Sequence, residues 1–239
     1  MRKNKRKLSI IIPTKNEEKY LPLLLKKLKK QSFQDFEIIV ADNDSKDKTV
    51  KIAKKFGCKI VKGGLPAIGR NNGANFAKGE ILLFLDADNI YIENDFLEKA
   101  LREFKRRNLG VAGFFVFPKE GFIDLFLYSF FYIFAFLTQW FLPHASNAIL
   151  VKKEIFKKVG GFNEEVLMGE DHYFVRKASK FGKFGILNIS IITSLRKRKK
   201  IGFLKMYFSY LLGGFFLFFI EKLPSLKKLQ KKFFLNYFS

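Results

Sequence analysis

The sequence predicts an α/β protein built on a mainly parallel sheet with helices on both faces. Two observations support this fold class. Short apolar, β-branched segments alternate with amphipathic segments at intervals of roughly 20 to 30 residues. The first such segment, residues 8–12, has the composition of a buried parallel strand and ends at Pro13. Repeated strand and helix segments at this spacing are typical of parallel sheets with crossover helices.

The expected elements follow one another without a repeat or a Gly/Ser linker. The expected strands are residues 8–12, 37–41, 59–61 and 81–85, and the expected helices are residues 17–30, 49–55 and 70–77. In the first helix, Tyr20, Leu24 and Leu28 recur every four residues and would form its buried face. We expect one doubly wound region over roughly residues 7–118.

Composition narrows the functional classes. The 239 residues include 45 Lys and Arg against 22 Asp and Glu, which gives a net charge of +23, and 48% of residues are apolar. The apolar content excludes a disordered chain, and a single cysteine, Cys58, excludes a disulfide-stapled domain. The charge favours an anionic partner: nucleic acid, a membrane surface or a phosphorylated substrate.

The distribution of phenylalanine favours a membrane surface over nucleic acid. Of the 31 Phe residues, 16 lie in the two segments 114–141 and 203–219, which contain few charges and adjoin basic runs. Nucleic-acid-binding faces instead mix aromatic and basic residues. Apolar stretches flanked by lysine and arginine are expected at a lipid headgroup boundary.

Polar loops follow the predicted strands, and in sheets of this kind ligands bind beyond the carboxyl ends of the strands. The most informative loop holds Asp86 and Asp88 directly after an apolar strand. Two carboxylates of this kind, completed by substrate phosphates, suit Mg²⁺ or Mn²⁺. The same residues could also cap a following helix or lie in a solvated turn.

Six motifs follow one another along the chain: SIIIPTKNE (residues 9–17), IVADNDSKDKT (39–49), GRNNG (69–73) with AKG (77–79), LDAD (85–88), VGGF (159–162) and GED (169–171). In this order they resemble the nucleotide-sugar-binding part of the family-2 inverting glycosyltransferases of the GT-A fold. The resemblance covers residues 8–185. It implies an α/β GT-A fold with a mixed, mainly parallel sheet over residues 1–195.

The resemblance also implies a set of site residues. Those implied to bind the nucleotide sugar are Pro13, Thr14, Asn16, Glu17, Asp42, Asp44, Ser45, Arg70, Asp86 and Glu170. Asp88, with Asp86, would coordinate Mg²⁺ or Mn²⁺ at the diphosphate, and Asp171 would be the general base. Each assignment has a structural alternative, since residues 42–49 could be a helix-entry turn, Arg70 a surface charge, and Glu170 with Asp171 a complement to a helix dipole. The two histidines, His144 and His172, are predicted to be structural or surface residues.

Two apolar segments, residues 122–142 and 201–220, suggest contact with a membrane. One crossing by the first would separate Asp88 from Asp171, which a single active site needs on the same side. We therefore expect region 119–143 to be an acceptor-side or interfacial insertion. Region 196–239 is expected to associate with the membrane, at the interface or through a transmembrane helix. A buried core or a dimer interface is the alternative for both segments.

Together these inferences predict a metal-dependent inverting glycosyltransferase at the cytoplasmic face of the cell membrane. Its partners would be a nucleotide-sugar donor, a lipid-linked or glycan acceptor and an anionic membrane surface, with no nucleic acid. Two alternatives remain open: a catalytically inactive GT-A scaffold that binds a membrane surface, and a basic nucleic-acid-binding protein.

Overall fold

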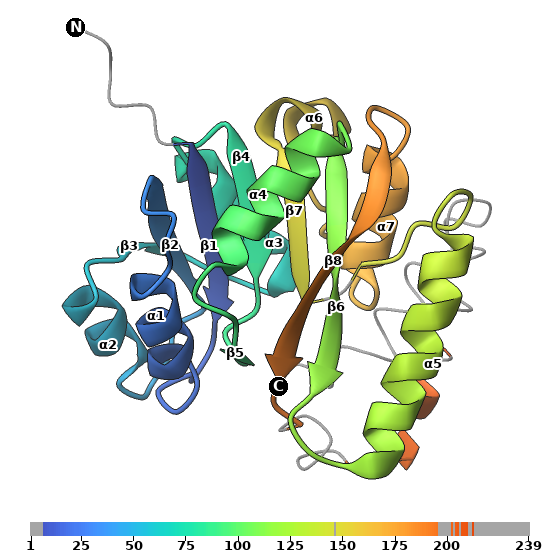
Figure 1. The fold of residues 1–239 in the computed structure, drawn as a ribbon. Coiled ribbons are helices and arrows are strands. Elements are labelled where there is room, and N and C mark those ends of the chain that lie inside the picture. The colour runs from blue at the N-terminus through green and yellow to red at the C-terminus, as the bar shows by residue number, and fades with distance from the viewer. Residues whose placement is uncertain are drawn as a thin grey trace, which may run out of the picture.

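A β-sheet of eight strands forms the centre of the computed structural model (Figure 1). Its strands are β1 (Leu8–Thr14), β2 (Phe36–Asp42), β3 (Lys59–Lys62), β4 (Ile81–Leu85), β5 (Asn89–Tyr91), β6 (Val111–Pro118), β7 (Ala148–Lys152) and β8 (Phe184–Thr193). They lie in the order β3-β2-β1-β4-β7-β6-β8-β5. The structure describes residues 7–145 and 147–195, together with residues 202, 204, 205, 207–209 and 212.

Helices cover both faces of this sheet, as the sequence predicts. They are α1 (Leu21–Lys29), α2 (Thr49–Lys55), α3 (Pro66–Phe76), α4 (Phe96–Arg106), α5 (Phe122–Thr138), α6 (Lys153–Val159) and α7 (Glu170–Ala178). Helices α1, α2 and α4 pack on one face and α3, α6 and α7 on the other, whereas α5 lies along one side (Figure 1).

Successive side chains of a strand point to opposite faces of the sheet, so the strands contribute to two hydrophobic cores, one on each face. In β1, Ile10 and Ile12 belong to the cluster under α1 and α4, whereas Ile11 belongs to the cluster under α3 and α7. All three side chains are fully buried. A strand buried on both sides is apolar at almost every position, which is why residues 8–12 lack the polar alternation of a half-exposed strand. The exception is Ser9, which is buried and donates its hydroxyl to Glu37 Oε1 at 2.7 Å.

The amino-terminal half of the sheet is parallel. β1 pairs with β2 and with β4, and β2 pairs with β3, all in parallel register. The register places Thr14 opposite Asp42 at the ends of β1 and β2. The carboxyl ends of these strands therefore meet at one edge of the sheet, where the polar loops gather.

Two helices begin at different residues from those expected. The first was expected from residue 17, but residues 17–20 form a turn and α1 begins at Leu21, next to Pro22. The third begins at Pro66 rather than residue 70. In both cases proline lies in the first turn, where its fixed φ angle suits a helix and its missing N–H needs no partner.

The sheet extends past residue 118, where the doubly wound region was expected to end. β7 lies between β4 and β6 and is antiparallel to both, and β8 then pairs in parallel with β6. The register between β6 and β8 shifts between Phe114 and Phe115, as in a β-bulge. The second half of the sheet is thus mixed. Strand β7, which lies near the centre of the whole sheet, comes from residues more than 60 positions after β4 in the chain.

Helix α5 begins after Gly121, whose φ angle of 95° is readily adopted only by glycine. It packs against β6 through Tyr132, whose ring lies 5.6 Å from that of Phe115 and 5.9 Å from that of Phe117. None of the helices among the described residues combines the length and apolarity needed to cross a membrane. Most of the predicted membrane-associating region 196–239, and most of segment 201–220 within it, lies outside the described residues.

Candidate active site

The loops after β1 and β2 are joined by side-chain hydrogen bonds. The Thr14 hydroxyl donates to Oδ1 of Asp42 at 2.9 Å, and the Ser45 hydroxyl donates to the same oxygen at 2.6 Å. The backbone N–H of Ser45 donates to the other carboxylate oxygen of Asp42 at 2.9 Å. Asp42 therefore holds Thr14 and Ser45, two other residues that the family resemblance assigned to nucleotide-sugar binding.

A second set of contacts joins the tips of the same loops. The backbone N–H of Asn16 donates to the Ser45 hydroxyl at 2.9 Å, and its side-chain oxygen accepts from the N–H of Lys46 at 2.8 Å. The N–H of Glu17 donates to the Thr49 hydroxyl at 2.7 Å. The two loops thus form one hydrogen-bonded rim at the carboxyl ends of β1 and β2.

Three further observations describe this rim. Asn16 and Asp44 have positive φ angles of 56° and 51°, a conformation that Asn and Asp tolerate better than other residues with side chains. Asp44 is exposed, whereas Asp47 accepts the N–H of Thr49 at 2.9 Å at the start of α2. Pro13 lies beneath the rim, opposite Ala41 in register. Residues 42–49 are therefore a helix-entry turn and also part of the sheet-edge rim.

Arg70 connects two of the predicted motifs. Its guanidinium donates to Asp86 Oδ1 at 2.9 Å and to Glu170 Oε1 at 2.7 Å, although Glu170 is 100 residues away in the sequence. Arg70 and Glu170 are only 4% and 8% exposed. The alternative that Arg70 is a surface charge is therefore wrong, because the side chain is buried in α3 and paired on two sides.

The glycine-rich VGGF motif supports Arg70 from below. The guanidinium carbon lies 5.3 Å above the centre of the Phe162 ring. Asn71 holds this phenylalanine by its backbone, accepting its N–H at 2.8 Å and donating to its carbonyl at 2.9 Å. The adjacent Gly161 has a φ angle of 82° and lies against the same asparagine, so that a Cβ there would clash.

Asp86 and Asp88 follow β4 at the same sheet edge. The loop is fixed by its backbone: the N–H of Asp86 donates to the Asn147 carbonyl at 2.9 Å, and the Asp88 carbonyl accepts the N–H of Ser194 at 3.0 Å. The short strand β5 follows, not a helix, so these residues do not cap one.

The donor set at this edge fits a metal only together with a substrate. No group of three or more His, Cys, Asp or Glu side chains that could hold a metal is found within the part of the chain that the structure describes. Two carboxylates, with Asp86 also engaged by Arg70, suit a divalent ion that takes its other ligands from phosphate and water.

Asp171 lies in the first turn of α7, after Gly169 at a φ angle of 76°. Its Oδ1 accepts the backbone N–H of His172 at 2.8 Å. Burial raises the pKa of the adjacent Glu170, and the negative charge of Asp171 raises it further, against the opposing effect of Arg70. Glu170 is therefore held by its ion pair with Arg70, whereas Asp171 is placed by the first turn of α7.

His172 lies beside Asp171 and His144 packs against it, and the sequence analysis assigned both histidines to a structural or surface role. The rings of His144 and His172 lie 5.2 Å apart, and His172 Nε2 is 4.0 Å from Asp171 Oδ1. The sequence indicates the place of His172, because this residue directly follows Asp171. No sequence signal indicates that His144 lies nearby, since it precedes Asp171 by 27 residues, in the loop between α5 and β7.

The sheet order, the polar rim at the carboxyl ends and the acidic residues around Arg70 define an α/β protein of the nucleotide-sugar-binding GT-A type. Solved structures support the fold. TarS residues 1–349 from S. aureus, in complex with UDP-GlcNAc, superpose with a TM-score of 0.64 at 25% identity, covering 79% of this chain and 58% of that one. A mannosyltransferase from Pyrobaculum calidifontis with GDP-Man and Mn²⁺ gives 0.62 at 19% identity, covering 78% and 56%.

The chain belongs to glycosyl transferase family 2, whose sequence model matches residues 9–163. A 4,4'-diaponeurosporenoate glycosyltransferase from Staphylococcus haemolyticus is 39% identical over 110 residues, 42% of this chain and 29% of that protein. A GalNAc(5)-diNAcBac-PP-undecaprenol beta-1,3-glucosyltransferase from Campylobacter jejuni is 35% identical over 129 residues, 48% of this chain and 40% of that protein. The chain therefore matches less than half the length of either relative.

Proposed function

We propose that this chain is a metal-dependent inverting glycosyltransferase that moves a sugar from a nucleotide diphosphate sugar to a lipid-linked or glycan acceptor at a membrane. The observation that supports it most directly is the buried ion-pair bridge of Arg70. This bridge brings the acid after β4 to the acids at the start of α7, next to the rim of loops from β1 and β2. Binding of UDP-GlcNAc by TarS makes uridine nucleotides the first donors to test.

In the proposed reaction Asp171 accepts the proton of an acceptor hydroxyl. The hydroxyl oxygen forms a bond to the anomeric carbon of the donor from the face opposite the diphosphate. The bond between that carbon and the diphosphate oxygen breaks, and the nucleoside diphosphate leaves with the electron pair. A carboxylate positioned within reach of the hydroxyl is a suitable base, and attack on the opposite face inverts the anomeric configuration.

Asp88, with Asp86, is the proposed holder of the divalent ion. Bound there, Mg²⁺ or Mn²⁺ would offset the negative charge that develops on the leaving diphosphate. Arg70 contributes in a different way, since its charge is already balanced by Asp86 and Glu170. We assign it to positioning these acids.

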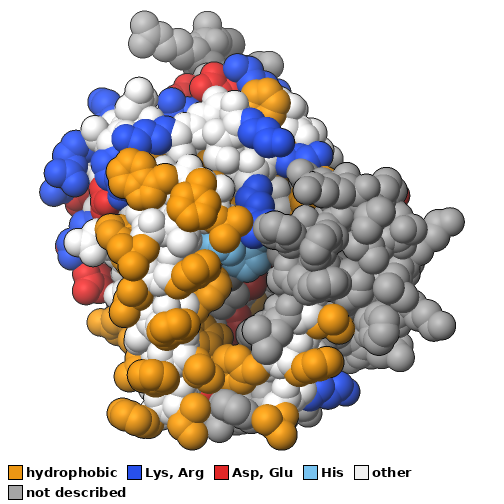
Figure 2. Space-filling model, turned by 90° about the vertical axis from the view of Figure 1, so that its right-hand side faces the viewer, with side chains coloured by type: hydrophobic (Ala, Val, Ile, Leu, Met, Phe, Trp, Pro, Cys, Tyr) orange, Lys and Arg blue, Asp and Glu red, His pale blue; other side chains and the backbone are white. Residues whose placement is uncertain are grey.

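The membrane part of the proposal depends on the outer face of α5. Hydrophobic side chains cover this face from end to end (Figure 2). Phe126 is 65% exposed and Phe130 is 67% exposed, and Trp140 just beyond the helix is 85% exposed. A contiguous apolar surface of this kind is costly in water, and the net charge of +23 favours an anionic lipid surface as what covers it.

Donor binding and turnover test the enzymatic proposal. The full chain, in a detergent without sugar headgroups, is titrated by calorimetry with UDP-, GDP- and dTDP-sugars, with and without Mn²⁺. We expect Asp88→Asn to lose the Mn²⁺-dependent part of the affinity. We expect Asp171→Asn to keep donor binding and to release nucleoside diphosphate about 10²- to 10⁴-fold more slowly. Asp95→Asn, the same change in the residue that precedes α4 and has a side chain 46% exposed, is the control.

The transferase proposal is wrong if the titration detects no binding of any nucleotide sugar, with or without Mn²⁺. In that case the inactive membrane-surface scaffold becomes the better description. Polynucleotide binding with a steep salt dependence, and without preference for any nucleotide sugar, would instead identify a nucleic-acid-binding protein.

Vesicle flotation tests the membrane part separately. We expect the double variant Phe126→Ser/Phe130→Ser to bind phosphatidylglycerol vesicles at least about tenfold more weakly, since each lost phenyl group removes roughly 1.5 to 3 kcal/mol of apolar burial. Leu23→Ser, which alters an exposed apolar side chain of α1, is the control. Unchanged flotation of the double variant would exclude α5 as the membrane-binding surface.

A further inference from the structure

Two neighbouring histidines present buried nitrogen atoms that no described residue satisfies. Both ring nitrogens of His144, and Nδ1 of His172, are buried without a hydrogen-bond partner among the described residues. Buried polar atoms are almost always hydrogen-bonded, because leaving one unpaired costs free energy. Unpaired groups grouped at one place are therefore a feature to be explained by a ligand.

The pair lies between the catalytic carboxylate and the apolar helix. His172 Nε2 is 4.0 Å from Asp171 Oδ1, a separation that a single hydroxyl oxygen can bridge by hydrogen bonds to both. On the other side, the His144 ring lies 5.8 Å from the ring of Phe131 and 6.1 Å from that of Phe134, both on α5. Figure 2 shows histidine side chains at the surface, beside the hydrophobic side chains of α5.

The protonation of the pair indicates the chemistry of the ligand. Burial, the neighbouring His172 and Arg176 lower the pKa of His144 to about 3, and burial together with Arg176 lowers that of His172 to about 4. Both rings are therefore neutral at pH 7, and each offers one N–H donor and one acceptor nitrogen. A hydroxyl group likewise both donates and accepts hydrogen bonds, whereas an ionised phosphate oxygen only accepts them.

We propose that His144 and His172 form the acceptor subsite of the enzyme, which binds the hydroxyl groups of an acceptor sugar and holds the reacting hydroxyl against Asp171. One hydroxyl contacts His172 Nε2 and Asp171, and neighbouring hydroxyls satisfy the unpaired nitrogens. The rings of Phe131 and Phe134 form the apolar wall on which the sugar or its lipid extension lies. The inference rests on the proposed function and names the acceptor chemistry at the same site.

Histidine NMR can test this directly, because the chain has only two histidines. The full chain with ¹³C-labelled histidine is titrated with octyl β-D-glucopyranoside, the matching galactoside and N-acetylglucosaminide, and octyl phosphate. The four probes share a tail and differ in the headgroup. We expect at least one glycoside to shift both imidazole signals, and octyl phosphate to shift them much less.

Two variants separate a ligand-binding role from a structural one. We expect His144→Phe to keep or raise the melting temperature, since it removes unpaired polar atoms among apolar neighbours, and to bind the active glycoside at least tenfold more weakly. A residue with a structural role would lose stability on this change. Lys180→Ala, an exposed change beyond α7, should alter neither property.

The opposite results overturn the proposal. If no glycoside shifts either signal, or if octyl phosphate shifts them equally, the pair does not recognise hydroxyl groups. Binding of UDP-GlcNAc and the other donors, measured by calorimetry on the same samples, is independent of this result. Donor binding without glycoside binding would refute the subsite alone, and glycoside binding without donor binding would refute only the proposed transferase.

Discussion

Replacing Arg70 by methionine should be among the most destabilising single substitutions in the described structure. The side chain is 4% exposed and donates to Glu170 at 2.7 Å and to Asp86 at 2.9 Å. Methionine has a similar length but no charge, so Glu170 would have to stay buried as an uncompensated anion beside Asp171 or take up a proton. Removing one partner of a buried ion pair costs about 3 to 5 kcal/mol, because the other charge is left uncompensated.

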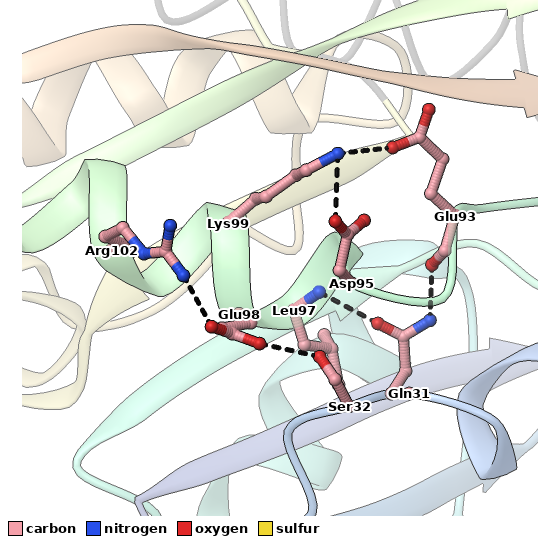
Figure 3. Close-up of polar contacts among 8 residues, drawn as sticks. All are labelled: Gln31, Ser32, Glu93, Asp95, Leu97, Glu98, Lys99 and Arg102. Carbon is pink, nitrogen blue, oxygen red and sulfur yellow. Dashed lines mark hydrogen bonds and ion pairs between the residues drawn. The ribbon is translucent and has the colours of Figure 1, made fainter.

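The assay is chemical denaturation of the full chain, with Lys99→Met as the matched control. Lys99 also pairs with two acids, Glu93 at 2.8 Å and Asp95 at 3.0 Å (Figure 3), but its side chain is 46% exposed. Exposed pairs contribute about 0.2 to 1 kcal/mol. The difference between the two variants therefore isolates the effect of burial.

The pH dependence and a second variant make the prediction sharper. Burial and Asp171 raise the pKa of Glu170 in the native protein, and the loss of Arg70 raises it further. The folded variant then holds a proton that the unfolded chain has released, so its free energy of unfolding falls as the pH rises through that interval. The loss should be larger at pH 8 than at pH 5, and Glu170→Gln added to Arg70→Met should restore part of it. A loss below about 1 kcal/mol, equal to that of Lys99→Met, would refute the reasoning.

Two further predictions concern packing and the histidine pair. Gly73→Ala should lower the free energy of unfolding by about 1 to 3 kcal/mol in chemical denaturation, because the new Cβ would lie 2.3 Å from Ile11 Cγ2. The control, Gly69→Ala, should be close to neutral, since its nearest contact is at 3.3 Å. Equal effects of the two substitutions would contradict this packing. Because native His144 and His172 have pKa values of about 3 and about 4, below the ordinary 6.5, the free energy of unfolding should fall as the pH drops from 6.5 towards 4. His144→Phe should show a smaller fall, and an unchanged pH profile would mean that His144 titrates normally.

Sequence reasoning predicted the parallel half of the sheet because its information is local. Each strand there is a short apolar run, and each crossover helix repeats apolar residues at helical spacing. The antiparallel strand β7 was not predicted, since its position between β4 and β6 is set by pairing with residues far away in the chain. Helix starts were misplaced where proline fixes the first turn.

The motifs placed most candidate residues at one sheet edge, but not their partners. Thr14, Asp42 and Ser45 were assigned from adjacent loops, and the structure joins all three. The role of Arg70 as a bridge between Asp86 and Glu170 depends on a contact across 100 residues, which no spacing in the sequence encodes.

The sequence by itself thus determined the fold class, the family resemblance and the identity of the acidic residues at the strand ends. These follow from composition, periodicity and motifs, which the chain carries in linear form. The tertiary structure alone decided that Arg70 is buried between two acids and that His144 meets His172 beside Asp171. It also decided that α5 turns its apolar side outward. Burial and distance between remote residues arise only when the sheet is assembled, and those two quantities set the charge state and the binding chemistry of the site.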